Sequence, residues 1–122
     1  MIASDELLTR IAEVLKAMAD PTRLKILHCI HTQERCVSDI LSVVGGSQAN
    51  VSKHLSVLKR AGLVDCRRSG LNVYYRIIDE GVFTICRNVC DSLELRVDHE
   101  RQTILKGKME IADVEAGNKV KA

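Results

Sequence analysis

The stretch from Gly45 to Arg76 constrains the fold more than any other part of this 122-residue chain. It opens with Gly45-Gly46-Ser47. This tripeptide suits a tight turn between two helices, because glycine accepts the left-handed conformation at a helix end and serine caps the next helix. A helical run with a polar leading edge follows, and then two β-prone runs, 63–68 and 71–78, surround Ser69-Gly70. We therefore predict a tight turn, a capped helix and a basic hairpin.

Regular spacing of apolar side chains predicts helices on both sides of this stretch. The first spans residues 4–19. Asp20-Pro21 then starts a second helix, because aspartate is a good N-cap and proline fits the first helical position. A third, short helix covers residues 37–44 and forms a helix-turn-helix with the fourth. The last helix begins near Asp79. The chain is thus predicted to be mainly α with a small β-hairpin.

A chain of this length is expected to hold one domain. Hydrophobic residues make up 46% of it, and only three side chains are aromatic, so the core must be aliphatic. The helical pattern fades after Lys106, which predicts a folded domain over residues 1–106 and a disordered tail over residues 107–122. The interior of such a small domain is limited, and a dimer interface would bury more apolar surface.

Positive charge is concentrated in the central stretch. Between Ser47 and Arg76 six Lys or Arg stand against one acid, a local net charge of +5 that leaves −3 for the rest of a chain whose total is +2. A basic centre in a mildly acidic chain predicts a polyanionic partner. We find no signal peptide and no apolar run that could span a bilayer, which predicts a cytoplasmic protein with no membrane partner and with reduced cysteines.

The predicted fourth helix presents polar side chains where a DNA duplex would lie. The amides of Gln48 and Asn50 can form paired hydrogen bonds to adenine edges. Lysines and arginines on this helix and on the hairpin suit phosphates, which position a protein without reading sequence. A solvated amphipathic helix would look similar by itself, but the basic hairpin behind it favours DNA. The candidate DNA-binding residues are Ser47, Gln48, Asn50, Ser52, Lys53, His54, Lys59, Arg60, Arg67 and Arg68.

Several motifs in this order resemble one protein family. They are Ala17-Met18-Ala19-Asp20-Pro21-Thr22-Arg23-Leu24-Lys25-Ile26-Leu27, then Ser47-Gln48, Val51-Ser52, His54-Leu55 and Leu58, and finally Gly62-Leu63-Val64 and Tyr74-Tyr75-Arg76. Over about residues 5–95 the chain is similar to the ArsR/SmtB family of bacterial winged-helix repressors. The resemblance implies a winged helix-turn-helix homodimer, built on the first and last helices, that binds double-stranded operator DNA. It also implies release of that operator by an inducer, commonly a metal or metalloid ion.

The inducer sites implied by this resemblance fit the chain only in part. The arsenic-type site resembles Glu-Leu-Cys-Val-Cys-Asp-Leu-Cys, and residues 34–41 keep only its first sulfur, Cys36, with Ser38 and Leu41 at the other two positions. The zinc-type positions of the last helix correspond to Asp79, Gly81, Ser92 and Leu95. Three of these four cannot ligate as that pattern requires, so the resemblance leaves the inducer open.

The last helix carries a pair of thiols instead, Cys86 and Cys90. Residues four apart share one helix face, with about 5–6 Å between their Cβ atoms, so the two thiolates can converge on one soft ion such as arsenite, cadmium, zinc or copper(I). Cys36 precedes a helix beside Arg35, where the dipole and the cation favour a reactive thiolate. We predict Cys86, Cys90 and, as a further ligand, Cys36 for a soft metal or metalloid effector. Packing as small hydrophobic side chains is the alternative for the pair.

Two other hypotheses stay open. In the first, the cysteines form a redox or persulfide switch, although family members of that kind align their first cysteine with His28, next to Cys29, and their second about a turn beyond Cys90. The chain would otherwise be a constitutive winged-helix interaction module without an inducer. Cys29 is expected in the core, and Cys66 is expected to be an incidental thiol. An enzyme is not expected, since the sequence has no nucleophile–base pair, phosphate loop or closed metal motif.

Overall fold

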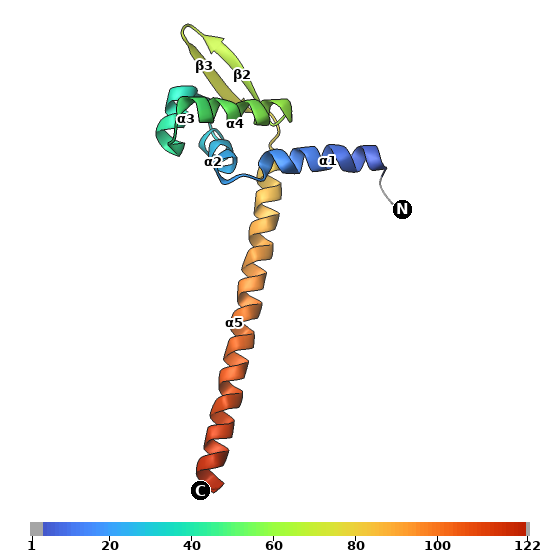
Figure 1. Cartoon of the computed structure of the whole chain (residues 1–122), viewed down its shortest axis with the longest axis vertical. Coiled ribbons are helices and arrows are strands. Elements are labelled where there is room, and N and C mark those ends of the chain that lie inside the picture. Colours follow the sequence, from blue (N-terminus) through green and yellow to red (C-terminus); the bar gives the residue numbers. More distant parts are fainter. Residues whose placement is uncertain (1–3, 122) are drawn as a thin grey trace. The chain divides into compact units, whose positions relative to one another are not determined.

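The computed structural model describes residues 4–121, with residues 118–121 described for the backbone only. It is mainly helical, as expected, and it divides after Val82 into two units that are described separately. The elements, labelled in Figure 1, are α1 (Asp5–Met18), α2 (Pro21–Cys29), β1 (Arg35–Cys36), α3 (Val37–Val44), α4 (Gln48–Arg60), β2 (Val64–Ser69), β3 (Asn72–Ile77) and α5 (Gly81–Lys121).

The first helix begins one residue after the predicted start, and the second begins where Asp20 predicted. The Ser4 side chain accepts a hydrogen bond from the Leu7 N–H at 3.2 Å and caps α1. The Asp20 carboxylate accepts from the N–H groups of Thr22 at 2.8 Å and Arg23 at 3.1 Å, with Pro21 at the first position of α2. Each cap satisfies N–H groups that have no partner inside the helix, which fixes the point where the helix starts.

Helices α3 and α4 form the predicted helix-turn-helix. Gly45 and Gly46 join them with φ angles of 78° and 84°, a left-handed conformation that side chains with a Cβ rarely adopt. The Ser47 hydroxyl accepts a hydrogen bond from the Asn50 N–H at 3.1 Å and so caps α4. Only Gly45, Gly46 and Ser47 separate the end of α3 from the start of α4.

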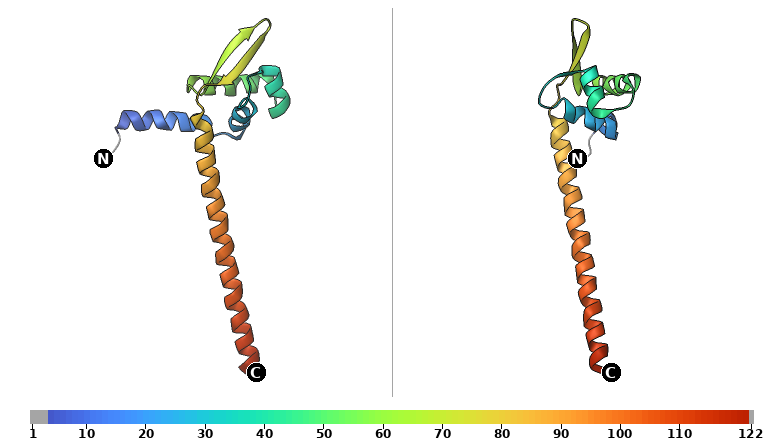
Figure 2. Two further views of the ribbon diagram at one scale, coloured as in Figure 1. Left: turned by 180° about the vertical axis from the view of Figure 1, so that it is seen from behind. Right: turned by 90° about the vertical axis from the view of Figure 1, so that its left-hand side faces the viewer.

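The hairpin differs from the prediction by one residue and has a third strand beside it. Ser69 pairs with Asn72, so the two-residue loop is Gly70-Leu71 and not Ser69-Gly70. Gly70 has a φ of 62°, as the first loop residue of a type II′ turn requires. The two-residue strand β1 pairs with β3 and gives the order β1-β3-β2. In Figures 1 and 2 the hairpin extends away from α2, α3 and α4.

The core of the first unit is aliphatic, as the composition predicted. The side chains that are at most 1% exposed come from α2, α3, α4, the strand β2, residues flanking these elements and the first turn of α5: Ile26, Leu27, Ile30, Ile40, Val51, Leu55, Leu58, Leu63, Val64 and Val82. Helix α1 contributes little to this core, because its apolar side chains Leu7, Leu8, Ile11 and Leu15 are 45–49% exposed in the single chain. Its apolar stripe therefore has no covering partner among the described residues of the first unit.

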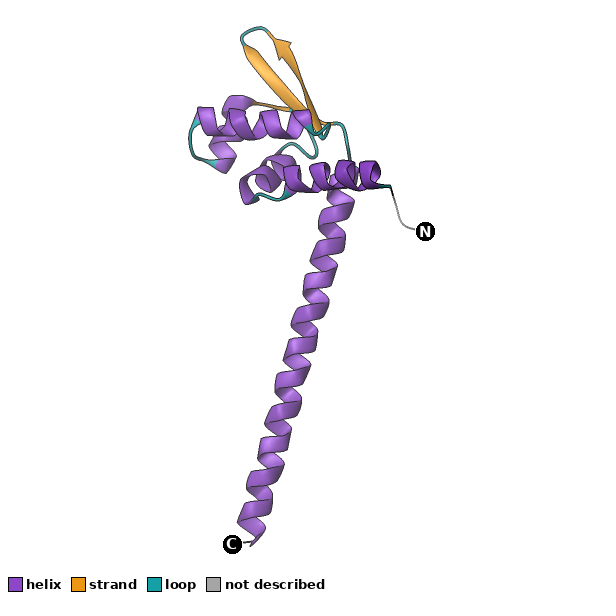
Figure 3. Cartoon of the chain, turned by 45° about the vertical axis from the view of Figure 1, so that its right-hand side comes forward, coloured by secondary structure: helices purple, strands orange, loops and turns teal. Residues whose placement is uncertain are grey.

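Helix α5, a single uninterrupted helix in Figure 3, contains the described residues of the second unit, which starts at Phe83. It begins at Gly81, whose N–H donates to the Asp79 carboxylate at 2.9 Å. It continues past Lys106 to Lys121, so the helix is longer than the fading sequence pattern indicated. Ala122 lies outside the described residues, and the division into a domain over 1–106 and a disordered tail over 107–122 stays a prediction. Among residues 4–121 no helix is both long and apolar enough to cross a membrane.

Candidate nucleic-acid interface

Helix α4 is held from one side and presents its other side to solvent. Val51, Leu55 and Leu58 lie at helical spacing and are fully buried, which fixes the rotation of the helix about its axis. The residues that sequence analysis chose for base contacts, Gln48 and Asn50, are exposed. Lys53 is also exposed, Ser52 is half-buried, and Ser47 keeps its hydroxyl on the Asn50 N–H. The amide side chains are therefore free to reach a ligand in front of α4.

His54 is engaged with the protein interior. It is half-buried, and its Nδ1 atom lies 3.2 Å from Nη1 of Arg23 on α2. Because a guanidinium group can only donate, Nδ1 must accept, and the neutral ring then carries its proton on Nε2. Arg23 was not among the predicted site residues, although the Asp-Pro-Thr-Arg motif contained it. Sequence analysis also did not predict which edge of the His54 ring would be occupied.

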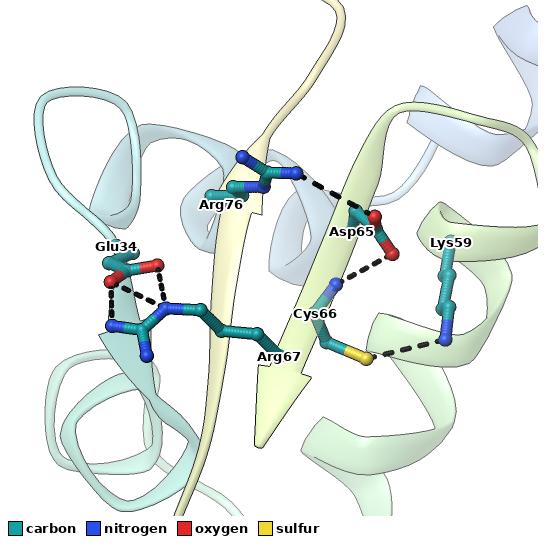
Figure 4. Close-up of polar contacts among 6 residues, drawn as sticks. All are labelled: Glu34, Lys59, Asp65, Cys66, Arg67 and Arg76. Carbon is teal, nitrogen blue, oxygen red and sulfur yellow. Dashed lines mark hydrogen bonds and ion pairs between the residues drawn. The ribbon is translucent and has the colours of Figure 1, made fainter. Parts of the chain in front are cut away.

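In the wing, Arg67 is held by a carboxylate. Its Nε atom donates to both Glu34 oxygens, at 2.9 and 3.0 Å, and its Nη2 atom also donates to Glu34 (Figure 4). The guanidinium carbon lies 5.0 Å from the centre of the Tyr74 ring, a cation–π contact. The hydrogen bond from Arg67 lowers the pKa of the Glu34 carboxyl group. Strand β1 follows Glu34 directly, so the short strand that the sequence did not predict anchors this partner beside the hairpin.

Lys59 also has a partner inside the protein. Its ammonium group donates to the Cys66 sulfur at 3.3 Å, from α4 to β2 (Figure 4). This hydrogen bond is the largest contribution that raises the pKa of Lys59. Burial, aided by Cys66, raises the pKa of the nearby Tyr75 hydroxyl. Cys66 is therefore not an isolated thiol but part of a contact that joins α4 to the wing.

The remaining candidate cations are available to a ligand. Lys53, Arg60 and Arg68 are exposed, and none has a side-chain hydrogen bond or ion pair within the part of the chain that the structure describes. Lys53 and Arg60 lie on α4 and Arg68 on β2. Exposed cations on both the helix and the wing can bind phosphate oxygens on the two sides of a DNA groove.

The cysteines do not form a metal site within the described residues of one chain. No group of three or more His, Cys, Asp or Glu in that part of the molecule has suitable geometry. In the second unit Cys86 is half-buried and Cys90 is exposed, one helical turn apart. In the first unit Cys36 is only 8% exposed, and its sulfur lies 3.2 Å from the Ser38 hydroxyl. A soft ion would find two thiols on α5 and would need further ligands from elsewhere.

Two smaller expectations about the first-unit thiols can be compared with the structure. Arg35 does not point at Cys36, because its Nε atom donates to the Cys29 backbone carbonyl at 2.8 Å. The Cys29 side chain is half-buried and not fully within the core, and burial is the main cause that raises the pKa of its thiol. Cys29 was expected in the core and lies only at its edge, and the raised pKa disfavours the thiolate.

The Glu34–Arg67 pair predicts a pH dependence of stability. Because the folded state lowers the pKa of Glu34, its contribution is complete above the ordinary carboxyl range of about 4–5 and is lost as the pH falls through the lowered pKa. Asp20 has the same sign, since hydrogen bonds from Arg23 and Thr22 lower its pKa. We expect Glu34→Gln to have a lower urea midpoint than the unsubstituted protein at pH 7, and we expect this difference to shrink as the pH falls below the ordinary carboxyl range.

The control for this prediction is Glu110→Gln, which removes an exposed carboxylate of α5. The difference between that variant and the unsubstituted protein should not change with pH over the same range. A gap between Glu34→Gln and the unsubstituted protein that stays constant from pH 7 to pH 3 would show that the pair does not lower the carboxyl pKa.

A helix-turn-helix of α3 and α4 followed directly by a β2–β3 hairpin with exposed basic residues defines the class of winged helix-turn-helix proteins. The sequence model of one protein family, described as bacterial regulatory protein, arsR family, matches residues 20–65. A transcriptional repressor SmtB homolog of Synechocystis sp. is 39% identical over 85 residues, 70% of this chain and 64% of that protein. A cadmium resistance transcriptional regulatory protein CadC homolog of Staphylococcus aureus is 40% identical over 73 residues, 59% of this chain and 60% of that protein. The chain thus spans less than two thirds of these two curated relatives.

A solved structure has the same fold over most of its length. The solution structure of the homodimeric winged helix-turn-helix DNA-binding domain from Mycobacterium bovis, a possible ArsR-family transcriptional regulator, has a TM-score of 0.67 and 36% identity. The alignment covers 80% of this chain and 93% of that one. The present chain belongs to the ArsR family of bacterial transcriptional regulators. The predicted family and fold class are confirmed, and the family is one of transcriptional regulators.

Proposed function

We propose that this chain is a DNA-binding transcriptional repressor that acts as a homodimer and leaves its operator when a thiol-binding effector, a soft metal or metalloid ion, binds. The observation that carries the proposal is the exposed amide edge of α4, Gln48 and Asn50, flanked by the unpaired cations Lys53, Arg60 and Arg68. The printed names of the two curated relatives, a transcriptional repressor and a cadmium resistance regulator, support it.

At the DNA, the predicted residues take three roles. Gln48 and Asn50 read base edges, while Lys53, Arg60 and Arg68 hold phosphates. Ser47, Ser52 and His54 add single hydrogen bonds, the last through its Nε2–H. Lys59 and Arg67 reach phosphates only by leaving Cys66 and Glu34, so we assign them a weaker contribution than the unpaired cations.

The homodimer follows from apolar surface that one chain leaves uncovered. Leu7, Leu8, Ile11 and Leu15 form an exposed stripe on α1, and α5 exposes Val89 and Leu93 among others. Burying such surface against a second copy is favourable at about 25 cal/mol per Å². A twofold dimer presents two copies of α4, which must match half-sites roughly 34 Å apart on the same side of the duplex.

The effector binds the α5 thiols in this proposal. One chain offers Cys86 and Cys90, and a soft ion takes three or four ligands, so a second α5 would complete the set. Cys36 is the further candidate ligand. An ion bound at the dimer interface changes the free-energy difference between dimer geometries, and with it the spacing of the two α4 helices.

The test is a titration of the protein with fluorescent DNA. A duplex selected by the purified protein from a random pool is bound at low ionic strength, and As(III), Cd(II), Zn(II), Cu(I), peroxide and polysulfide are then added separately. We expect a dimer by sedimentation and release of the duplex by at least one of the ions. Release only by peroxide or polysulfide would identify a redox or persulfide switch, and no release by any of the six would favour a constitutive module. Failure to select any duplex would refute DNA binding itself.

A further inference from the structure

Arg23 makes side-chain hydrogen bonds to two other helices at once. From the first turn of α2, its Nε atom donates to the Ala17 carbonyl at 2.6 Å and its Nη2 atom to the Lys16 carbonyl at 3.1 Å. Both carbonyls belong to the last turn of α1, and the Lys16 carbonyl also accepts a hydrogen bond from the Ala19 N–H at 3.2 Å. Its Nη1 atom lies 3.2 Å from Nδ1 of His54, in the middle of α4. One guanidinium group therefore joins α1, α2 and α4.

The base of this side chain is itself fixed. The Arg23 backbone N–H donates to the Asp20 carboxylate at 3.1 Å, and this hydrogen bond is the main cause that lowers the pKa of Asp20. The positive charge of Arg23 acts in the same direction on Asp20. The donors of a guanidinium group are arranged in a rigid plane, so they can satisfy acceptors in different directions at once, which a lysine ammonium on a flexible stem cannot reproduce.

Direct packing between α1 and α4 is sparse, which gives the Arg23 contacts more weight. An open groove of about 380 Å³ separates parts of the two helices. It is lined by Glu13, Lys16, Ala17, Val57, Arg60 and Ala61. Because side chains do not fill this space, the angle between α1 and α4 is held by few contacts, and the polar bridge through Arg23 is one of them.

We propose that Arg23 is a positioning residue for DNA recognition, which locks α4 to the C-terminal end of α1 through Nδ1 of His54. The proposal rests on the proposed function and adds a route for its regulation. Helix α1 carries the uncovered apolar stripe that we assign to the dimer interface, and α4 carries the amides that we assign to base reading. The Arg23 bridge transmits the position of α1 to α4. It also leaves the Nε2–H as the only hydrogen-bond donor of the His54 ring.

The test compares variants that remove either end of the bridge. Arg23→Met removes the donors, His54→Leu removes the acceptor, and His54→Asn keeps an acceptor close to the place of Nδ1. We expect Arg23→Met and His54→Leu each to weaken binding of the selected duplex by about tenfold, the loss of roughly one base contact. The loss in the double variant should be smaller than the product of the two single losses, because both changes remove the Arg23–His54 bond. His54→Asn should bind the duplex more tightly than His54→Leu, because it keeps the acceptor for Arg23 and loses only the single hydrogen bond assigned to the Nε2–H.

Lys25→Met is the matched control, since it removes one positive charge from an exposed position of the same helix. An effect of Lys25→Met equal to that of Arg23→Met would overturn the proposal, as would additive effects of Arg23→Met and His54→Leu. A loss in His54→Asn as large as that in His54→Leu would also overturn it. These variants are compared after urea unfolding has shown that each is folded at the assay temperature.

A second measurement does not depend on DNA. NMR of the imidazole nitrogens in ¹⁵N-labelled protein, at a pH above the ordinary titration range of histidine, shows which nitrogen carries the proton. The His54 signals are assigned by their loss in His54→Asn. We expect the proton on Nε2. A proton on Nδ1 in the unsubstituted protein would overturn the bridge directly. If the protein selected no duplex, the proposed function would fail, while this measurement and the same double-variant cycle in urea would still decide whether Arg23 binds His54.

Discussion

Alanine at both Gln48 and Asn50 is expected to weaken binding of the selected duplex by at least about thirtyfold and to leave binding of a random duplex almost unchanged. Each bidentate amide contact to a base is worth roughly 1–3 kcal/mol, and 1.4 kcal/mol corresponds to a factor of ten. Both side chains are exposed and make no contact that the core needs. Alanine also favours helix, so the double variant should stay folded.

Fluorescence anisotropy with the two duplexes at several salt concentrations measures this effect. The salt dependence of affinity should be the same in the variant and the unsubstituted protein, because the phosphate contacts of Lys53, Arg60 and Arg68 are retained. Gln102→Ala removes an equally exposed amide from α5 and serves as the control, with no expected change. Unchanged affinity of the double variant for the selected duplex would show that α4 is not the reading helix.

The second large effect is expected for Cys86→Ser combined with Cys90→Ser. Serine nearly preserves the volume of cysteine but lacks the soft thiolate that binds such ions. The free energy that couples two sites is typically 1–3 kcal/mol, a factor of about 5–150 in affinity. We therefore expect the double variant to bind the selected duplex as tightly as the unsubstituted protein and to lose the whole of its response to the inducing ion.

Duplex release is measured by titrating the same ions into each protein–DNA complex. Cys29→Ser is the control for loss of a thiol, because burial raises the pKa of Cys29 and the residue is not an expected ligand. It should respond to the ion as the unsubstituted protein does. Cys36→Ser tests the further ligand, and a partial loss of response there would add Cys36 to the site. Normal release in the α5 double variant would place the effector site elsewhere.

Local sequence was sufficient for most of the secondary structure of the first unit. Asp20 and Ser47 mark the starts of α2 and α4 because their side chains satisfy N–H groups only a few residues away. Gly45 marks the end of α3 because its φ of 78° excludes most other residues. These interactions lie within a few residues of one another, so the order of residues contains all the information that they need.

Elements that depend on distant partners were predicted less well. Strand β1 has two residues, too few for an alternating pattern, and it forms only because Arg35 and Cys36 pair with Tyr75 and Tyr74. The hairpin loop was displaced by one residue, since the pairing of Ser69 with Asn72 is decided by the register of the whole ladder. The end of α5 was also missed, because its side chains past Lys106 show little apolar periodicity.

For the candidate DNA interface, the sequence alone determined which residue types gather there: amides at the start of α4, cations behind them, and more cations on the hairpin. Only the tertiary structure decided which of those cations are available. Arg67 and Lys59 are bound by Glu34 and Cys66, and His54 is bound by Arg23, which is 31 residues away in the chain. The physical reason is that a charged side chain binds whichever opposite or polar group folding places within about 3 Å, and that neighbour comes from another element of the fold.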